Sequence, residues 1–193
     1  MRTVNHLLIT CLLFLLYSCS DKLSTGKAEK MIKEHSTFPE INDVNIEYGF
    51  IAYDKDSLPS FYYVLQEKGM FKVEYLGSGG LFVINYRFRV TPTPEAKKFI
   101  TEEDNNPRKQ GNTGEFMYNS RFKTCEVDFN KVESIQEIPA FNAADITYTV
   151  KRHSFTPFWN YYLDEDKKMP DTIQQRKFGV VKTNDGWKPA KFK

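Results

Sequence analysis

Few side chains in the sequence are of the types that usually perform catalysis or bind metals. Beyond residue 18 the only histidines are His35 and His153, and neither has a second histidine, a cysteine or a carboxylate at the spacing of metal ligands. There is no G-x-S-x-G motif, and Asp54-Lys55-Asp56 lacks the later glycine and glutamate of a calcium loop. The sequence therefore predicts no catalytic residue, no metal and no cofactor.

Cys125 is the last of three cysteines, and it falls in a predicted strand. The other two, Cys11 and Cys19, belong to the N-terminal segment, so Cys125 has no partner for a disulfide or a Cys-x-x-Cys site. A lone strand cysteine is commonly buried and unreactive, whereas a redox thiol sits in an exposed, electropositive setting. Lys123 and Glu126 nearly cancel in charge beside it, which favours an inert core residue over a redox thiol.

One aromatic stretch could form a binding surface. Residues 155–162 (FTPFWNYY) carry five aromatic side chains, and Pro157 argues against a central strand there. If the stretch is extended, neighbouring side chains point opposite ways, so Trp159 and Tyr161 share one face and Tyr162 takes the other. Phe158, Trp159 and Tyr161 are the candidate binding residues. The alternative is that the chain turns here and both faces pack into the core.

The N-terminus carries an apolar run that ends abruptly. Arg2 precedes Leu7–Tyr17, eleven mostly apolar residues, which is short of the roughly 20 that span a bilayer. These are the proportions of a secretory signal peptide. An ordinary signal peptide with a chance cysteine is the alternative to the interpretation that follows.

Leu16-Tyr17-Ser18-Cys19 resembles the lipobox of bacterial lipoproteins, although Tyr17 is larger than the residue preferred at its position. The resemblance implies that residues 1–18 are removed and that Cys19 receives acyl chains, which anchor the protein without a membrane span. Residues 19–27 are then the lipidated cysteine and a polar tether. Ser20 after the cysteine resembles lipoproteins sent to the outer membrane; whether the protein faces the periplasm or the surface is left open.

Composition predicts one ordinary domain after the signal. The chain of 193 residues has a net charge of +2, which falls to +1 because Arg2 is lost with the signal peptide. This nearly balanced charge argues against nucleic acid as a partner. Its 16 Phe and 11 Tyr suit a strand-rich fold. Residues 28–193 are expected to form a single α+β domain.

Capping and turn residues locate the elements of the first half. Ser24 or Thr25 caps a short helix at residues 27–34, and Pro59 and Gly69 bracket a second helix at residues 59–68, with a strand at 61–65 as its alternative. Strands are expected at 44–53, 70–76 and 81–90, the last two joined by a turn at Gly77–Gly80, followed by one helical turn within 91–100. Residues 101–114 contain no large apolar side chain and predict a flexible loop, or a boundary between two halves.

The second half is predicted to be almost entirely strand. Expected strands are residues 115–128, 132–138, 144–155 and 172–182, and alternation is clearest where Ile146, Tyr148 and Val150 face one side. Asn184-Asp185-Gly186 predicts a tight turn before a last short strand at Trp187.

Three segments resemble small uncharacterised lipoproteins of Gram-negative gut bacteria. They are YVLQEKGMFKVEYL, KVESIQEIPAFNAADITYTVKRHSFTPF and VVKTNDGWKP. The resemblance implies short N-terminal helices packed on a curved, mainly antiparallel sheet of cystatin-like or similar type. It transfers no catalytic residue.

We therefore expect a lipid-anchored, non-catalytic domain of the cell envelope that binds a protein or another envelope component. The first alternative is a glycan-binding accessory lipoprotein that uses the aromatic stretch. The second is an envelope hydrolase, which would need a pocket joining His35 or His153 to carboxylates.

Overall fold

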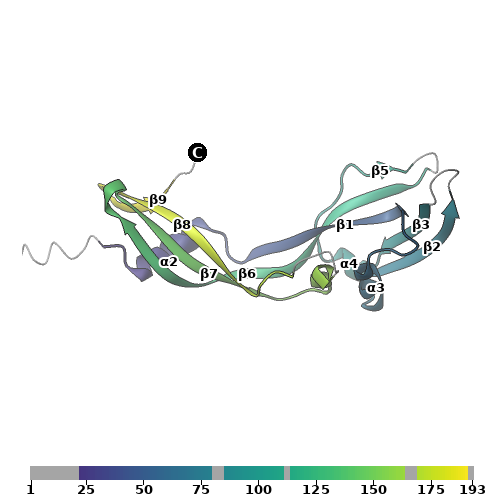
Figure 1. The fold of residues 1–193 in the computed structure, drawn as a ribbon, viewed down its shortest axis with the longest axis horizontal. Coiled ribbons are helices and arrows are strands. Elements are labelled where there is room, and N and C mark those ends of the chain that lie inside the picture. Colours follow the sequence, from purple (N-terminus) through teal and green to yellow (C-terminus); the bar gives the residue numbers. More distant parts are fainter. Residues whose placement is uncertain (1–21, 80–84, 111–113, 164–168, 191–193) are drawn as a thin grey trace, which may run out of the picture. The chain divides into compact units, whose positions relative to one another are not determined.

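The longest element is strand β6 (Phe116–Ile138), which runs for 23 residues. The computed structural model describes residues 22–79, 85–110, 114–163 and 169–190 (Figure 1). They form two compact units, and β6 contributes to both. Unit 1 contains the described residues up to Phe38, Phe129–Val150 and those from Gln174 onward, and unit 2 contains Pro39–Asp128 and Lys151–Ile173.

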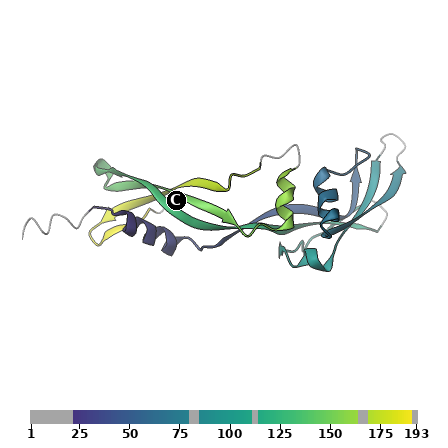
Figure 2. The same cartoon turned by 90° about the horizontal axis from the view of Figure 1, so that it is seen from below.

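Unit 1 combines one helix with four neighbouring strands. Helix α2 (Thr25–His35) begins at Ser24, whose side chain accepts a hydrogen bond from the Lys27 backbone N–H, and it buries Ala28 and Ile32. The strands follow in chain order as β6, β7 (Ala143–His153), β8 (Ile173–Thr183) and β9 (Gly186–Pro189). Figure 2 shows α2 lying along this sheet, where its apolar face is covered.

Unit 2 is a sheet with short helices on it. The strand order is β2 (Phe71–Gly79), β3 (Asn85–Pro92), β1 (Glu40–Tyr53) and β6, with antiparallel pairing throughout. Two short strands, β4 (Ile100–Glu102) and β5 (Arg108–Lys109), also pair with β6. The helices are α3 (Ser60–Glu67), α4 (Pro94–Lys97) and the 3-10 helix η2 (Pro157–Leu163).

Large rings fill the core of unit 2. Phe71 and Phe122 are almost fully buried, and their rings meet edge to face with centroids 5.8 Å apart. Helix α3 adds Phe61, Tyr62 and Leu65, which lie on one helical face because their spacing is i, i+1 and i+4. The core therefore joins the sheet to α3.

Several predicted elements are confirmed. The structure has the two predicted helices, the first strand, the helical turn at α4 and the hairpin of β8 and β9 around Asn184 and Asp185. Ile146, Tyr148 and Val150 are buried as their alternation indicates. The chain is α+β with a mainly antiparallel sheet, as predicted.

Other predictions differ from the structure. The expected turn at Gly77–Gly79 is wrong, because these residues pair with β3 after a bulge near Gly77; Gly80 lies outside the described residues. Phe116–Ile138 form one continuous strand, where two strands at 115–128 and 132–138 were expected. The described chain divides into two compact units whose boundaries do not fall within 101–114, and the single domain expected over residues 28–193 stays a prediction.

Residues 101–110 are also more ordered than the predicted flexible loop. Strands β4 and β5 pair with β6 at either side of this segment. Between them the Asp104 carboxylate accepts hydrogen bonds from the backbone N–H groups of Asn106 and Asn119, at 2.8 and 2.7 Å. These contacts fix the segment against β6, and residues 111–113 lie outside the description.

Within the described residues no helix has the length and apolar character needed to cross a membrane. Cys19 and the expected signal peptide lie outside the described residues.

Candidate functional site

The predicted aromatic stretch is helical and not extended. Residues Pro157–Leu163 form η2, in which side chains three positions apart lie on the same face. Phe158 is 0% exposed and stacks on Phe122 with ring centroids 4.5 Å apart. Phe158 is therefore a core residue, and its assignment to a binding surface is wrong. The shared face of Trp159 and Tyr161 was expected only for an extended chain, and the helical segment does not meet that condition.

Trp159 lies in a small cluster of rings at the surface of unit 2. It is half-buried, with its ring 4.7 Å from that of Phe155 and 5.0 Å from that of Tyr162. Phe155 is 47% exposed. Trp159 and Tyr162 are neighbours here because η2 aligns positions i and i+3.

Tyr161 lines a separate cavity of about 300 Å³, called here the aromatic cleft. Tyr161 meets Phe61 of α3 edge to face, with centroids 5.0 Å apart. Tyr53 and Tyr62 add two more rings, and Asn45 and Asn119 add amide groups. Rings beside hydrogen-bonding side chains suit a ligand that has both apolar faces and hydroxyl groups.

Tyr62 holds α3 against β1 at the base of the aromatic cleft. Its hydroxyl donates a 2.7 Å hydrogen bond to the backbone carbonyl of Glu47. Burial raises the pKa of the Tyr62 phenol well above its ordinary value, so the group remains a neutral donor. The Glu47 carboxylate instead accepts a hydrogen bond from Arg108 at 2.7 Å.

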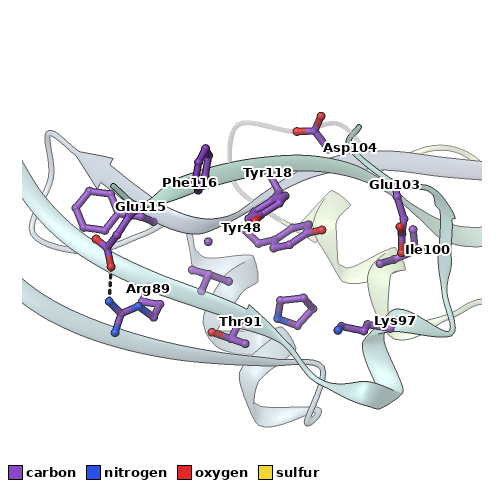
Figure 3. A pocket seen from close by; sticks show the side chains of 14 residues that line it. Tyr48, Arg89, Thr91, Lys97, Ile100, Glu103, Asp104, Glu115, Phe116 and Tyr118 are labelled. Carbon is purple, nitrogen blue, oxygen red and sulfur yellow. Dashed lines mark hydrogen bonds and ion pairs between the residues drawn. The ribbon is translucent and has the colours of Figure 1, made fainter. Parts of the chain in front are cut away.

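A larger cavity of about 470 Å³ lies where strands β1, β3 and β6 meet, and it is called here the β1–β3–β6 pocket (Figure 3). Its lining comes from four separate segments of the chain. They are Tyr48–Phe50 on β1, Arg89–Pro92 on β3, residues 97–104 from α4 onward, and residues 115–118 at the start of β6. This size lies within the range of small-molecule sites.

Gly49 makes the pocket possible. It is the one residue of β1 that pairs with both neighbours, with Val90 of β3 and with Met117 of β6. Its φ is +90°, and a Cβ at this position would overlap the backbone oxygen of Phe116. Only glycine allows β6 to cross so close to β1.

The pocket has an aromatic centre. Tyr48 and Tyr118 are paired across the β1–β6 ladder, and their rings stack with centroids 5.1 Å apart and planes 9° apart. The Tyr48 hydroxyl lies 3.1 Å from the Ser120 hydroxyl, which fixes the orientation of the ring. Phe50 and the partly exposed Phe116 add apolar area.

The rim of the pocket carries two groups of charged side chains, which lie at opposite ends of Figure 3. Each group contains both positive and negative charges. At one end Arg89 forms ion pairs with Glu115 and, at 3.4 Å, with Glu74. The hydrogen bond to Glu115 raises the pKa of Arg89 above its already high ordinary value. At the other end are Lys97 and Glu103, both exposed, and among the described residues neither forms an ion pair.

His153 belongs to a polar cluster that the sequence interpretation missed. Its Nε2 lies 2.9 Å from the Asp128 carboxylate, and its Nδ1 lies 2.9 Å from the Ser154 hydroxyl. A second carboxylate oxygen, from Glu126, is 3.8 Å from Nδ1. The two carboxylates lie on β6, so the signal was the i, i+2 spacing of Glu126 and Asp128 on one strand face opposite β7.

Serine, histidine and aspartate together are the groups of a hydrolase triad, but here the arrangement is a surface network. Ser154 directly follows His153 in the chain and is exposed, with φ +51°. None of the three cavities found in unit 2 includes His153 or Ser154. The cluster connects β7 to β6. None of those cavities provides a place for a substrate beside it. His35 belongs to unit 1, where its ring lies 5.3 Å from that of Phe178.

Cys125 is fully buried in unit 2, as the sequence predicts for an inert core residue. Burial raises the pKa of its thiol, which disfavours the reactive thiolate. Within the described residues, no group of three or more His, Cys, Asp and Glu side chains could hold a metal ion.

Comparison of the chain with known protein families, with curated proteins and with solved structures gives no match. The functional argument therefore depends on the cavities and side chains described above.

Proposed function

We propose that this protein is a non-catalytic binding domain, held at the cell envelope by acyl chains on Cys19, that recognises its ligand without a cofactor. The observation that carries the binding role is the β1–β3–β6 pocket, with its stacked tyrosines and its rim of both charges. We also propose a cystatin-like relationship for unit 1, where one helix precedes four strands that are neighbours in chain order.

The ligand that fits the pocket is a short zwitterionic peptide segment of an envelope component. At one end of the pocket Lys97 can bind a carboxylate and Glu103 an ammonium group, and the Tyr48–Tyr118 stack can cover an apolar part of the ligand beside them. Aromatic and arginine side chains are typical of such recognition surfaces.

The binding test is an NMR titration of the ¹⁵N-labelled domain with a muropeptide, a zwitterionic glycopeptide. We expect shifts in backbone signals at residues 48–50, 89–92 and 115–118, and a loss of affinity in Lys97→Gln. Lys177→Gln is the matched control, an exposed lysine of unit 1. Shifts confined to unit 1, or equal affinity in both variants, would contradict ligand binding at the β1–β3–β6 pocket.

The anchor has a separate test. Cys19→Ala removes the thiol that is predicted to be lipidated. We expect this variant to be unlipidated, and either soluble or still attached to its signal peptide. The measurement is incorporation of a labelled fatty acid together with fractionation of the cells. Normal amounts of mature Cys19→Ala protein in the detergent-soluble envelope fraction would contradict lipidation.

A second candidate function is glycan binding at the aromatic cleft, which is favoured by the position of Tyr161 among three other rings. A neutral oligosaccharide such as chitotetraose is the probe, since it lacks the charges that the larger pocket would bind. We expect Tyr161→Ala to weaken its binding and Trp159→Ala, outside the cleft, to leave it unchanged. If both changes weaken binding equally, the aromatic cleft is excluded as the glycan-binding site.

A further inference from the structure

The connection between β6 and β7 presents an exposed phenylalanine at its tip. The 3-10 helix η1 (Pro139–Phe141) forms this tip, and Phe141 is 77% exposed, more than any other large apolar side chain found exposed in the described chain. Pro139 and Ala140 beside it are exposed as well. The tip is therefore an apolar projection of unit 1.

The tip is held in a fixed shape. Asn142 takes the left-handed conformation, with φ +47°, and its backbone N–H donates to the Pro139 carbonyl at 3.1 Å. Its own carbonyl accepts a 2.6 Å hydrogen bond from the backbone N–H of Lys182 on β8. Phe141 is thus presented by an anchored turn, and its exposure is not a consequence of a loose loop.

The beginning of the described chain lies at the same end of unit 1. The Leu23 backbone N–H donates a 3.3 Å hydrogen bond to the Glu137 side chain, two residues before η1, and the Leu23 side chain is buried. Figure 1 shows the start of α2 and the β6–β7 connection at this common end. The chain therefore enters the fold next to the tip.

Chain length limits how far this end can be from a lipid anchor. Cys19 is four residues before Leu23, and four extended residues span at most about 14 Å. Four residues also separate Glu137 from Phe141. Lys22 and Lys27, on either side of Leu23, are exposed and can attract anionic lipid headgroups.

We propose that the Phe141 tip docks into the interface of the same bilayer that holds the anchor. This inference rests on the proposed lipidation of Cys19. Aromatic rings favour the membrane–water interface, and a second apolar contact beside the anchor fixes the orientation of unit 1 on the bilayer.

The test uses the mature chain coupled to vesicles through Cys19 with a maleimide lipid, a reaction that buried Cys125 escapes. Phe141→Trp reports contact with the bilayer when the vesicles contain brominated phosphatidylcholine, which quenches tryptophan. Gln175→Trp is the matched control, exposed near the other end of β8, eight residues or about 26 Å along the strand from Thr183. The parent protein supplies the background from Trp159 and Trp187.

We expect Phe141→Trp emission to shift to shorter wavelength and to lose intensity, with no such change for Gln175→Trp. In the chain without any anchor, Phe141→Ala should bind anionic vesicles about tenfold more weakly than the parent, since one aromatic side chain is lost from the interface. Equal quenching at both positions, or no quenching at position 141, would overturn the proposal that the tip docks into the bilayer. Because the anchor is attached chemically, this result does not depend on whether cells lipidate Cys19, which the fatty-acid experiment decides separately.

Discussion

The two units fill their interiors with different side chains. Unit 2 packs rings around Phe71, Phe122 and Phe158, whereas unit 1 buries mainly aliphatic groups such as Ile32, Ile146 and Val180, with Tyr148 and Trp187 as exceptions. The aromatic cleft and the β1–β3–β6 pocket both lie in unit 2. Unit 1 instead carries the chain entry and the Phe141 tip. The difference teaches that the cavities and the exposed apolar tip belong to separate units, which is why we propose separate parts of the chain for recognition and for attachment.

The largest expected effect is on the aromatic core. Phe158→Ala should destabilise unit 2 by about 3–5 kcal/mol, because it removes a fully buried ring that stacks on Phe122. Phe155→Ala, at an exposed ring, should cost no more than about 0.5 kcal/mol. Chemical denaturation of a Trp187→Phe background measures this, since Trp159 then reports unit 2 alone. Similar losses in both variants would contradict the assignment of Phe158 to the core.

The aliphatic core of unit 1 gives the matching experiment. Ile32→Ala should cost about 2–5 kcal/mol, because Ile32 is fully buried on the inner face of α2. Lys30→Ala, on the exposed side, should change stability by less than about 0.5 kcal/mol. Trp187 in a Trp159→Phe background follows unit 1. If Ile32→Ala shifts the Trp159 transition as much as the Trp187 transition, the units unfold together and the comparison fails.

Gly49→Ala tests the backbone on which the pocket depends. We expect a loss of about 1–3 kcal/mol from strain, together with loss of muropeptide binding, because the added Cβ forces β6 away from β1. Gly77→Ala is the control, with a similar positive φ but nothing within contact distance of a Cβ. It should retain binding. Loss of binding in both variants would show that general strain, and not the β1–β6 crossing, is responsible.

Cys125 sharpens the distinction between packing and chemistry within unit 2. Its burial and raised pKa predict that a thiol reagent labels it only after denaturation. Cys125→Ala should cost about 1–2 kcal/mol with no loss of binding. Mass spectrometry of the labelled Cys19→Ala protein measures the rate. Fast labelling of the folded domain would favour the redox alternative.

The smallest effect concerns the surface network of Glu126. A hydrogen bond from Lys123 holds the pKa of Glu126 below its ordinary value, so the carboxylate stabilises the fold when ionised. This contribution is complete above the ordinary glutamate pKa and is lost as pH falls through the lowered one. Acid titrations of the parent and Glu126→Gln should therefore differ at neutral pH and converge in acid. A difference that grows as pH falls would contradict the stated direction.

Local signals predicted the regular elements well. Ser24 before α2, Pro59 before α3 and the Asn184-Asp185 turn each act within a few residues, which is the range that a single sequence reveals. The failures came from longer-range effects. Gly77 looked like part of a turn but forms a bulge inside β2, and Pro157 begins η2 where a strand or loop was expected.

The candidate site was much less predictable than the fold. The lining of the β1–β3–β6 pocket comes from segments that are distant in the sequence, and only their pairing in the sheet brings them together. Gly49 carried no visible signal, because its role depends on the Phe116 carbonyl 67 positions away. Tyr161 was identified as a candidate, but the rings of Tyr53 and Phe61 beside it were not.

The central claim, that one part of the chain attaches and the other recognises, can be tested directly by hydrogen–deuterium exchange of the lipidated protein in nanodiscs, with and without muropeptide. The account predicts that the bilayer protects the backbone around residues 137–143, compared with the protein in solution. It predicts that the muropeptide protects residues 48–50, 89–92 and 115–118 and leaves the tip unchanged. Ligand protection at the tip, or bilayer protection at the pocket without any at the tip, would contradict it.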